Sequence, residues 1–233
     1  MPGGDARAAH AIAVSDRILQ GAVAFAVTAV AVQTAVDLVV HWAFDHDVWV
    51  LLADSDESVF AWASIVTTFA AALGALLLSL AGRDGRALLW FVAAAVAFLS
   101  LDDFVQIHER LGERAGGNDA DDGWEPGRLV WPAIFFPLLA ALFLALRRVA
   151  ARLGGRAGFL VLVALALFAA AILLELASAG IVRAGYDAGT TVYELEVVAE
   201  EGAELAGWVL VTGAFLAALV RELGAPRAGL TRD

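Results

Sequence analysis

Carboxylates and a histidine gather at the end of one hydrophobic segment, in the sequence SLDDFVQIHERLGE at 100–113. A helix turns by about 100° per residue, so Asp102, Gln106 and Glu109 would lie on one narrow stripe. The apolar run before them, 87–101, would span only about 22 Å, less than the roughly 30 Å of a bilayer core. These side chains are therefore expected below the membrane surface, where they could bind a metal ion or transfer protons.

Two further residues of this stretch lie off that stripe. Asp103 falls on a neighbouring stripe with Arg110 and Arg114, with which it could pair. His108 falls on the side of Leu101, so it would face a shared site only if the helix is rotated or distorted there.

A second group of acids precedes the last hydrophobic segment, in YELEVVAEEGAELAGW at 193–208. Helical spacing places Glu196, Glu200 and Glu204 on one face, with Glu201 beside them and Glu194 at the edge. The uncharged part that follows, 205–220, has sixteen residues and is too short to cross a bilayer. Glu204, and with it Glu200 and Glu201, is therefore expected within the span.

Polar groups at the same depth occur in two more segments. Glu175 lies within the apolar sequence AILLELASAGIV, and Gln33, Asp37 and His41 follow one another at intervals of four residues. That spacing places the latter three on one helix face. Four helices would thus carry polar side chains to one depth in the outer leaflet.

Buried acids of this kind need compensation. An acidic side chain inside a membrane costs about 2.5–3.5 kcal/mol on insertion scales. Neighbouring carboxylates cannot all stay ionised without a bound metal, an arginine partner or a proton.

The elements that would position these residues are membrane-spanning helices. The chain has 233 residues, of which 61% are hydrophobic, and its mean hydropathy is +0.78. This composition predicts an all-α, polytopic bundle of six transmembrane helices over 17–222, with short polar tails at 1–16 and 223–233. The expected helices are 18–41, 58–81, 87–109, 129–148, 157–182 and 196–222.

Two residue types are missing from the sequence. There is no cysteine, which excludes disulfides and thiolate metal sites. All fifteen basic residues are arginines, so a retinal Schiff base, which needs a lysine, is also excluded.

Charge is divided between the two sides of the predicted bundle. Eleven of the fifteen arginines fall on the side of the termini, whereas 21 of the 26 acids fall on or near the opposite side. The positive-inside rule then places both termini in the cytoplasm. It predicts a multi-pass protein of the cell's inner membrane, with the polar site open to the extracytoplasmic side.

The first hypothesis for this site is a divalent metal ion, because oxygen ligands with a few imidazoles suit Zn, Mn, Fe or Ca. A di-iron centre would show two Glu-x-x-His pairs, and the sequence has none. Metal and a spare carboxylate could activate water to hydrolyse a lipid or amphipathic substrate, with Glu204 or Glu109 as general base. The candidate metal ligands from this reasoning are Asp102, Glu109, Glu175, Glu200 and Glu204, with Asp37, His41, Gln106 and His108 as additional candidates.

Two other functions stay open. The carboxylates could carry protons or cations in a coupled transporter or channel, although the inner halves of the predicted helices are mostly Ala, Leu and Val. The chain could also be a non-catalytic membrane subunit, its acids making helix-end hydrogen bonds and arginine pairs. The expected partners are the lipid bilayer and a lipid or small molecule, with no nucleic acid; the oligomeric state is left open.

Three strings of residues resemble a group of uncharacterised bacterial multi-pass membrane proteins: LSLDDFVQIHERLG, LLELASAG and VVAEEGAELAGW. That group carries an Asp-Glu…His-Glu string, a later buried glutamate and a Glu-Glu-x-x-Glu string before the last helix. Asp103 stands here where the group has Glu. The resemblance covers about the last four helices and brings no known activity. The resemblance favours Asp102, Asp103, His108, Glu109, Glu175, Glu200, Glu201 and Glu204 as the metal ligands. The multi-histidine zinc pattern of ceramidase-type membrane hydrolases is not met.

Overall fold

The computed structural model describes residues 3–44, 48–53, 55, 57–82, 85–107, 110–111, 127–186 and 190–225. Within these ranges there is no β-strand, and six helices are long and apolar enough to cross a membrane. The prediction of an all-helical chain with six such helices is confirmed. A short 3₁₀ helix, η1 (Trp49–Leu51), follows the first of them. The six helices are α1 (Gly3–Phe44), α2 (Val59–Ala81), α3 (Arg86–Val105), α5 (Gly127–Leu153), α6 (Gly155–Arg183) and α7 (Thr191–Gly224).

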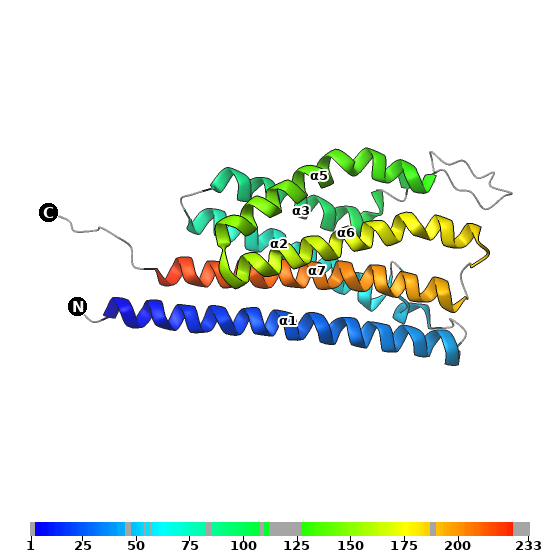
Figure 1. The fold of residues 1–233 in the computed structure, drawn as a ribbon, viewed down its shortest axis with the longest axis horizontal. Helices are drawn as coiled ribbons and strands as arrows, with labels where there is room; N and C mark the ends of the chain where they lie inside the picture. Colours follow the sequence, from blue (N-terminus) through cyan, green and yellow to red (C-terminus); the bar gives the residue numbers. More distant parts are fainter. Residues whose placement is uncertain are drawn as a thin grey trace.

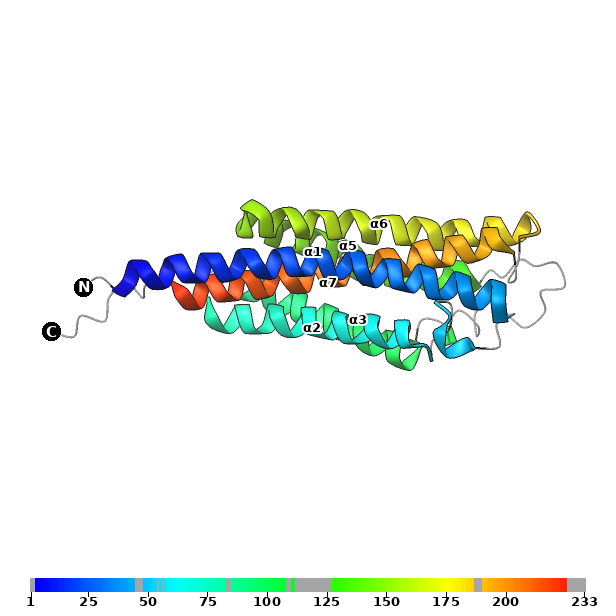
Figure 2. The same ribbon diagram turned by 90° about the horizontal axis from the view of Figure 1, so that it is seen from below.

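The helices lie side by side along one common direction, with both chain termini at the same end (Figure 1). We call this the terminal end and the opposite one the distal end. Helix α7 is the centre of the bundle, because it packs extensively against α1, α2 and α6. Figure 2 shows α1 and α7 running together and reaching beyond the other helices at the terminal end. Helix α3 packs mainly against α2 and α5.

The first helix is longer than predicted. It begins at Gly3 instead of near residue 18, so most of the predicted polar tail is helical. The extension packs on the end of α7, where Gly224 lies against Ala11 and Arg221 pairs with Asp16 at 3.4 Å. At 1.5 Å per residue, α1 is about 63 Å long, roughly twice the thickness of a bilayer core. Tertiary contact with α7 explains why a polar sequence continues the helix.

The third helix is shorter than predicted. It ends at Val105, because Gln106 adopts a left-handed backbone with φ of 56°. No other non-glycine residue in the described ranges has a positive φ. Left-handed backbone breaks the 100° rotation on which the proposed stripe of Asp102, Gln106 and Glu109 depended. The stripe therefore does not extend past Gln106 as one regular helix face, and Glu109 lies outside the described residues.

Glycines bring α7 close to its neighbours. A Cβ atom at Gly213 would meet the Cβ of Ala22 on α1, and one at Gly207 would meet the ring of Phe168 on α6. Small residues of this kind let membrane helices approach one another closely. Dense packing thus holds α7 between α1 and α6.

Candidate functional site

The distal half of α7 carries acids on two different faces. Glu194 points toward α1, where it meets His41. Glu200 and Glu204 interact with Glu175 of α6. Six residues separate Glu194 from Glu200, which corresponds to about 240° of helical rotation. The single acidic arc expected from the sequence is therefore two sites.

The first site, the α6–α7 carboxylate cluster, consists of Glu175, Glu200 and Glu204. The carboxyl group of Glu200 lies close to that of Glu175, and Glu204 interacts with both. Glu201 also interacts with Glu200, but it lies on the face of α7 that carries Glu194. All four side chains are half-buried. Neighbouring carboxyl groups cannot all stay ionised without compensation, which a proton held between them would supply.

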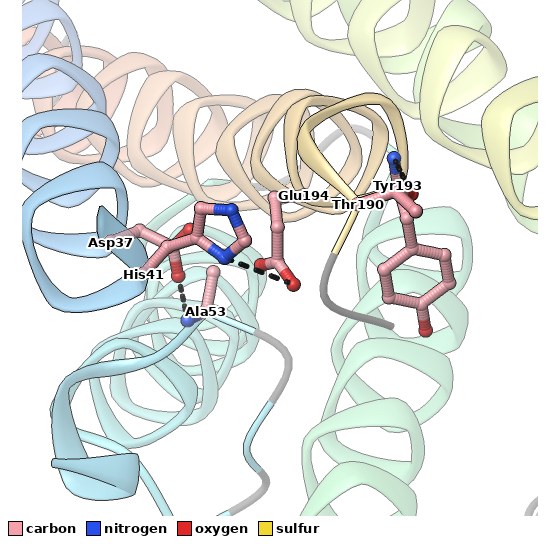
Figure 3. A network of polar contacts seen from close by, with 6 residues as sticks. All are labelled: Asp37, His41, Ala53, Thr190, Tyr193 and Glu194. Atoms are coloured by element: carbon pink, nitrogen blue, oxygen red, sulfur yellow. Dashed lines mark hydrogen bonds and ion pairs between the residues drawn. The ribbon is translucent and has the colours of Figure 1, made fainter. Parts of the chain in front are cut away.

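The second site, the α1–α7 polar site, consists of Asp37, His41 and Glu194 (Figure 3). The Nδ1 atom of His41 lies 3.8 Å from Oε1 of Glu194, and the two side chains are only 8% and 5% exposed. Asp37 lies one turn before His41 on α1, and its side chain is buried. Tyr193 points away from this group on the other side of α7.

A loop segment closes the α1–α7 polar site. The backbone N–H of Ala53 donates a hydrogen bond of 2.7 Å to Oδ1 of Asp37. Ala53 is itself buried against Val197 and Val198 of α7. The segment after η1 therefore folds back onto both helices and covers Asp37.

The predicted residues of α3 lie apart from these sites. Asp102 is buried and Asp103 is half-buried, and each interacts with another group. Because α3 packs mainly against α2 and α5, these aspartates come from a different part of the distal end than Glu175. Gln106 is half-buried at the end of that helix, whereas His108 and Glu109 lie outside the described residues.

The metal site expected from the sequence is not visible in the part of the chain that the structure describes. There, no group of three or more His, Cys, Asp or Glu side chains is arranged to hold a metal ion. Two of the predicted ligands, His108 and Glu109, fall outside that part. The metal site therefore stays a prediction.

Sequence reasoning assigned Glu194 only to the edge of the acidic arc, and it did not include Gln33 among the candidate ligands. The spacing of Glu194 and Glu201, seven residues apart, places them on a face different from that of Glu200. That signal could have separated the two sites. The hydrogen bond from Ala53 to Asp37 had no signal in the sequence, because it depends on a backbone N–H and on the path of a loop.

Comparison with known proteins places the chain in a family without assigned function. The family described as a domain of unknown function (DUF8692) matches residues 19–219, which covers all six helices in whole or in part, and the chain belongs to this family. No curated protein and no solved structure matches the chain.

Proposed function

We propose that this member of the DUF8692 family is a multi-pass membrane protein that exchanges a proton for a cation at the α6–α7 carboxylate cluster. The exchange would be the binding step of a proton- or cation-coupled transporter. The observation that carries the proposal is the close approach of the carboxyl groups of Glu175 on α6 and Glu200 on α7. A shared proton neutralises one charge of such a pair, and a cation can replace it by binding the same oxygens.

The location of the cluster supports this function. Glu175 lies within α6 and Glu200 within α7, both of which are long and apolar enough to cross a membrane. Ionisable residues inside membrane helices are expensive and typically mark ion pathways or proton relays. The arginine-rich terminal end would face the cytoplasm, and the distal end would face the extracytoplasmic side of the inner membrane.

Three threonine hydroxyls nearer the terminal end are engaged in hydrogen bonds. The hydroxyls of Thr67 and Thr68 donate to backbone carbonyls of α2, and Thr212 of α7 donates to the carbonyl of Thr67 at 3.1 Å. Of these hydroxyls only that of Thr212 links two helices, and within the described residues the three form no visible chain toward the terminal end. Exchange would therefore occur with the distal side first, and transport would require a second arrangement of α6 and α7.

Proton release on cation binding tests the proposal. Purified protein in weakly buffered detergent, with a pH-sensitive dye, is titrated with Na⁺, K⁺, Ca²⁺ or Mn²⁺. The wild type should release about one proton per cation bound, and Glu200→Gln should release none. Glu222→Gln, which removes an exposed carboxylate from the same helix, should behave as wild type. Equal release from Glu200→Gln, or none from the wild type with any of these cations, would contradict the proposal.

A metal-dependent hydrolase is the second candidate. The observation that favours it is the buried carboxylate of Asp102, only 3% exposed, shortly before the sequence positions of His108 and Glu109. Carboxylates and an imidazole would suit Zn²⁺ or Mn²⁺. Elemental analysis of protein purified without chelators should then find one metal per chain, and Asp102→Asn should lose it. Metal-free wild-type protein with cation-dependent proton release would favour exchange instead.

A further inference from the structure

The amide of Gln33 on α1 is buried without a hydrogen-bond partner in the described part of the chain. Its side chain is 1% exposed, and neither its oxygen nor its nitrogen makes a hydrogen bond within the described residues. An amide has one acceptor oxygen and two N–H donors, and leaving them unpaired in a buried place costs about 1–3 kcal/mol. A group that pairs with both ends of the amide would remove this penalty.

Gln33 belongs to the same face of α1 as the α1–α7 polar site. Asp37 follows it by one turn, is also 1% exposed, and accepts the hydrogen bond from Ala53. Two pairs of neighbouring residues define the register of the antiparallel helices α1 and α7. Val30 lies next to Gly202, and His41 lies next to Glu194. The segment of α1 that carries Gln33 and Asp37 thus lies along the acidic distal half of α7.

The chemistry of these groups favours a cation with water. The amide oxygen of Gln33 and the carboxylate of Asp37 are oxygen ligands of the kind that bind small inorganic cations. The amide N–H groups need an acceptor, which a cation cannot be but a water molecule on the cation can. No three His, Cys, Asp or Glu side chains in the described ranges form a metal site, so amide and water would complete the coordination.

We propose that Gln33 and Asp37 form a second cation site, which binds a small inorganic cation with water between α1 and α7. The site is independent of the α6–α7 carboxylate cluster, because the two sites lie on different faces of α7. Ala53 donates its N–H to Asp37 at this site, and the His41–Glu194 pair lies one turn beyond Asp37.

Direct binding of labelled ions tests the site. Equilibrium dialysis of the purified full-length protein with ²²Na⁺, and separately with ⁴⁵Ca²⁺, measures ions bound per chain. Gln33→Met keeps the volume of the side chain and removes the amide. Gln20→Met makes the same change at an exposed position of α1 and serves as the matched control. Glu200→Gln disables the carboxylate cluster and leaves α1 intact.

The proposal expects one ion that Gln33→Met loses and that both Gln20→Met and Glu200→Gln retain. Retention of ²²Na⁺ would identify a monovalent site, and retention of ⁴⁵Ca²⁺ a divalent site. Gln33→Asn, which keeps a shorter amide, should weaken binding less than Gln33→Met does, which separates loss of the amide from misfolding. Because the carboxylate cluster would bind a cation of its own, Gln33→Met is also measured in the Glu200→Gln background. Binding that survives in this double variant, binding that disappears in Glu200→Gln alone, or no bound ion of either kind would overturn the proposal, the last result leaving water as the partner of Gln33.

Discussion

The two halves of α7 carry different kinds of side chain, acidic in the distal half and small or apolar in the terminal half. Its distal half carries Glu194, Glu200 and Glu204, which interact with polar groups of α1 and α6. Its terminal half carries small and apolar residues such as Gly213 and Phe215, which are buried against α1 and α2. Both halves pack against α1, and they differ in the side chains that they place at this contact.

This difference shows how a helix bundle can tolerate many acids. In a membrane, close packing of small residues provides much of the association between helices. The terminal half of α7 supplies such packing, and it holds the helices in register at the distal end. We therefore expect that the distal acids serve binding and are not needed to hold the helices together. The predictions below test this division of roles, beginning with the largest expected effect.

The largest effect is expected from filling a glycine contact in the terminal half. Gly213→Leu places a side chain where the Cβ of Ala22 already lies, and overpacking of this kind should lower the free energy of unfolding by about 3 kcal/mol. Reversible denaturant titration in mixed micelles measures the change. Gly21→Leu is the control, since a Cβ there meets no atom within 4 Å. Equal stability of the two variants would show that the terminal half does not hold the bundle together.

A smaller and local effect is expected at the distal end. Asp37→Ala removes the acceptor of the Ala53 N–H, and a hydrogen bond to a charged group is worth about 1.5–3 kcal/mol. Hydrogen exchange of the Ala53 amide should become at least about tenfold faster, while amides of the terminal half of α7 keep their protection. Faster exchange along the whole of α7 would mean that the distal site also stabilises the bundle, and the comparison would fail.

The smallest effect is expected at the ends of α1 and α7, where Asp16 and Arg221 are 3.4 Å apart. Both side chains are more than a third exposed, and surface pairs contribute only about 0.2–1 kcal/mol. A double-mutant cycle with Asp16→Asn and Arg221→Gln should give a coupling energy near the lower end of that range. A coupling above it would show that this ion pair, and not glycine packing alone, holds the terminal half.

Hydrophobicity was enough to predict the fold, because six long apolar segments leave little choice of class. The helix ends were less predictable. The N-terminal extension of α1, which begins at Gly3, depends on contact with the end of α7. The left-handed backbone of Gln106 ends α3, although no glycine or proline at that position predicts a helix end. Such features arise from tertiary context, which overrides local sequence preference.

The sequence pointed to acids of α6 and α7 that lie together, but it did not predict which partners the other polar residues meet. Counting apolar residues placed Glu175, Glu200 and Glu204 at one level, and the structure brings these three together. The sequence could not show that Glu194 turns to His41, because a helical wheel does not say which neighbour each face meets. Nor could it show that Gln33 is buried without a partner.

Infrared difference spectroscopy of the purified protein tests the central claim most directly, because it detects the carbonyl stretch of a protonated carboxylic acid. If Glu175 and Glu200 share a proton that a cation displaces, the wild type should lose one such band when the bound cation replaces the proton. Glu200→Gln should lack the band from the start, and Glu222→Gln should keep it. A band that remains in Glu200→Gln, or a wild-type spectrum that no cation changes, would contradict proton–cation exchange at this cluster.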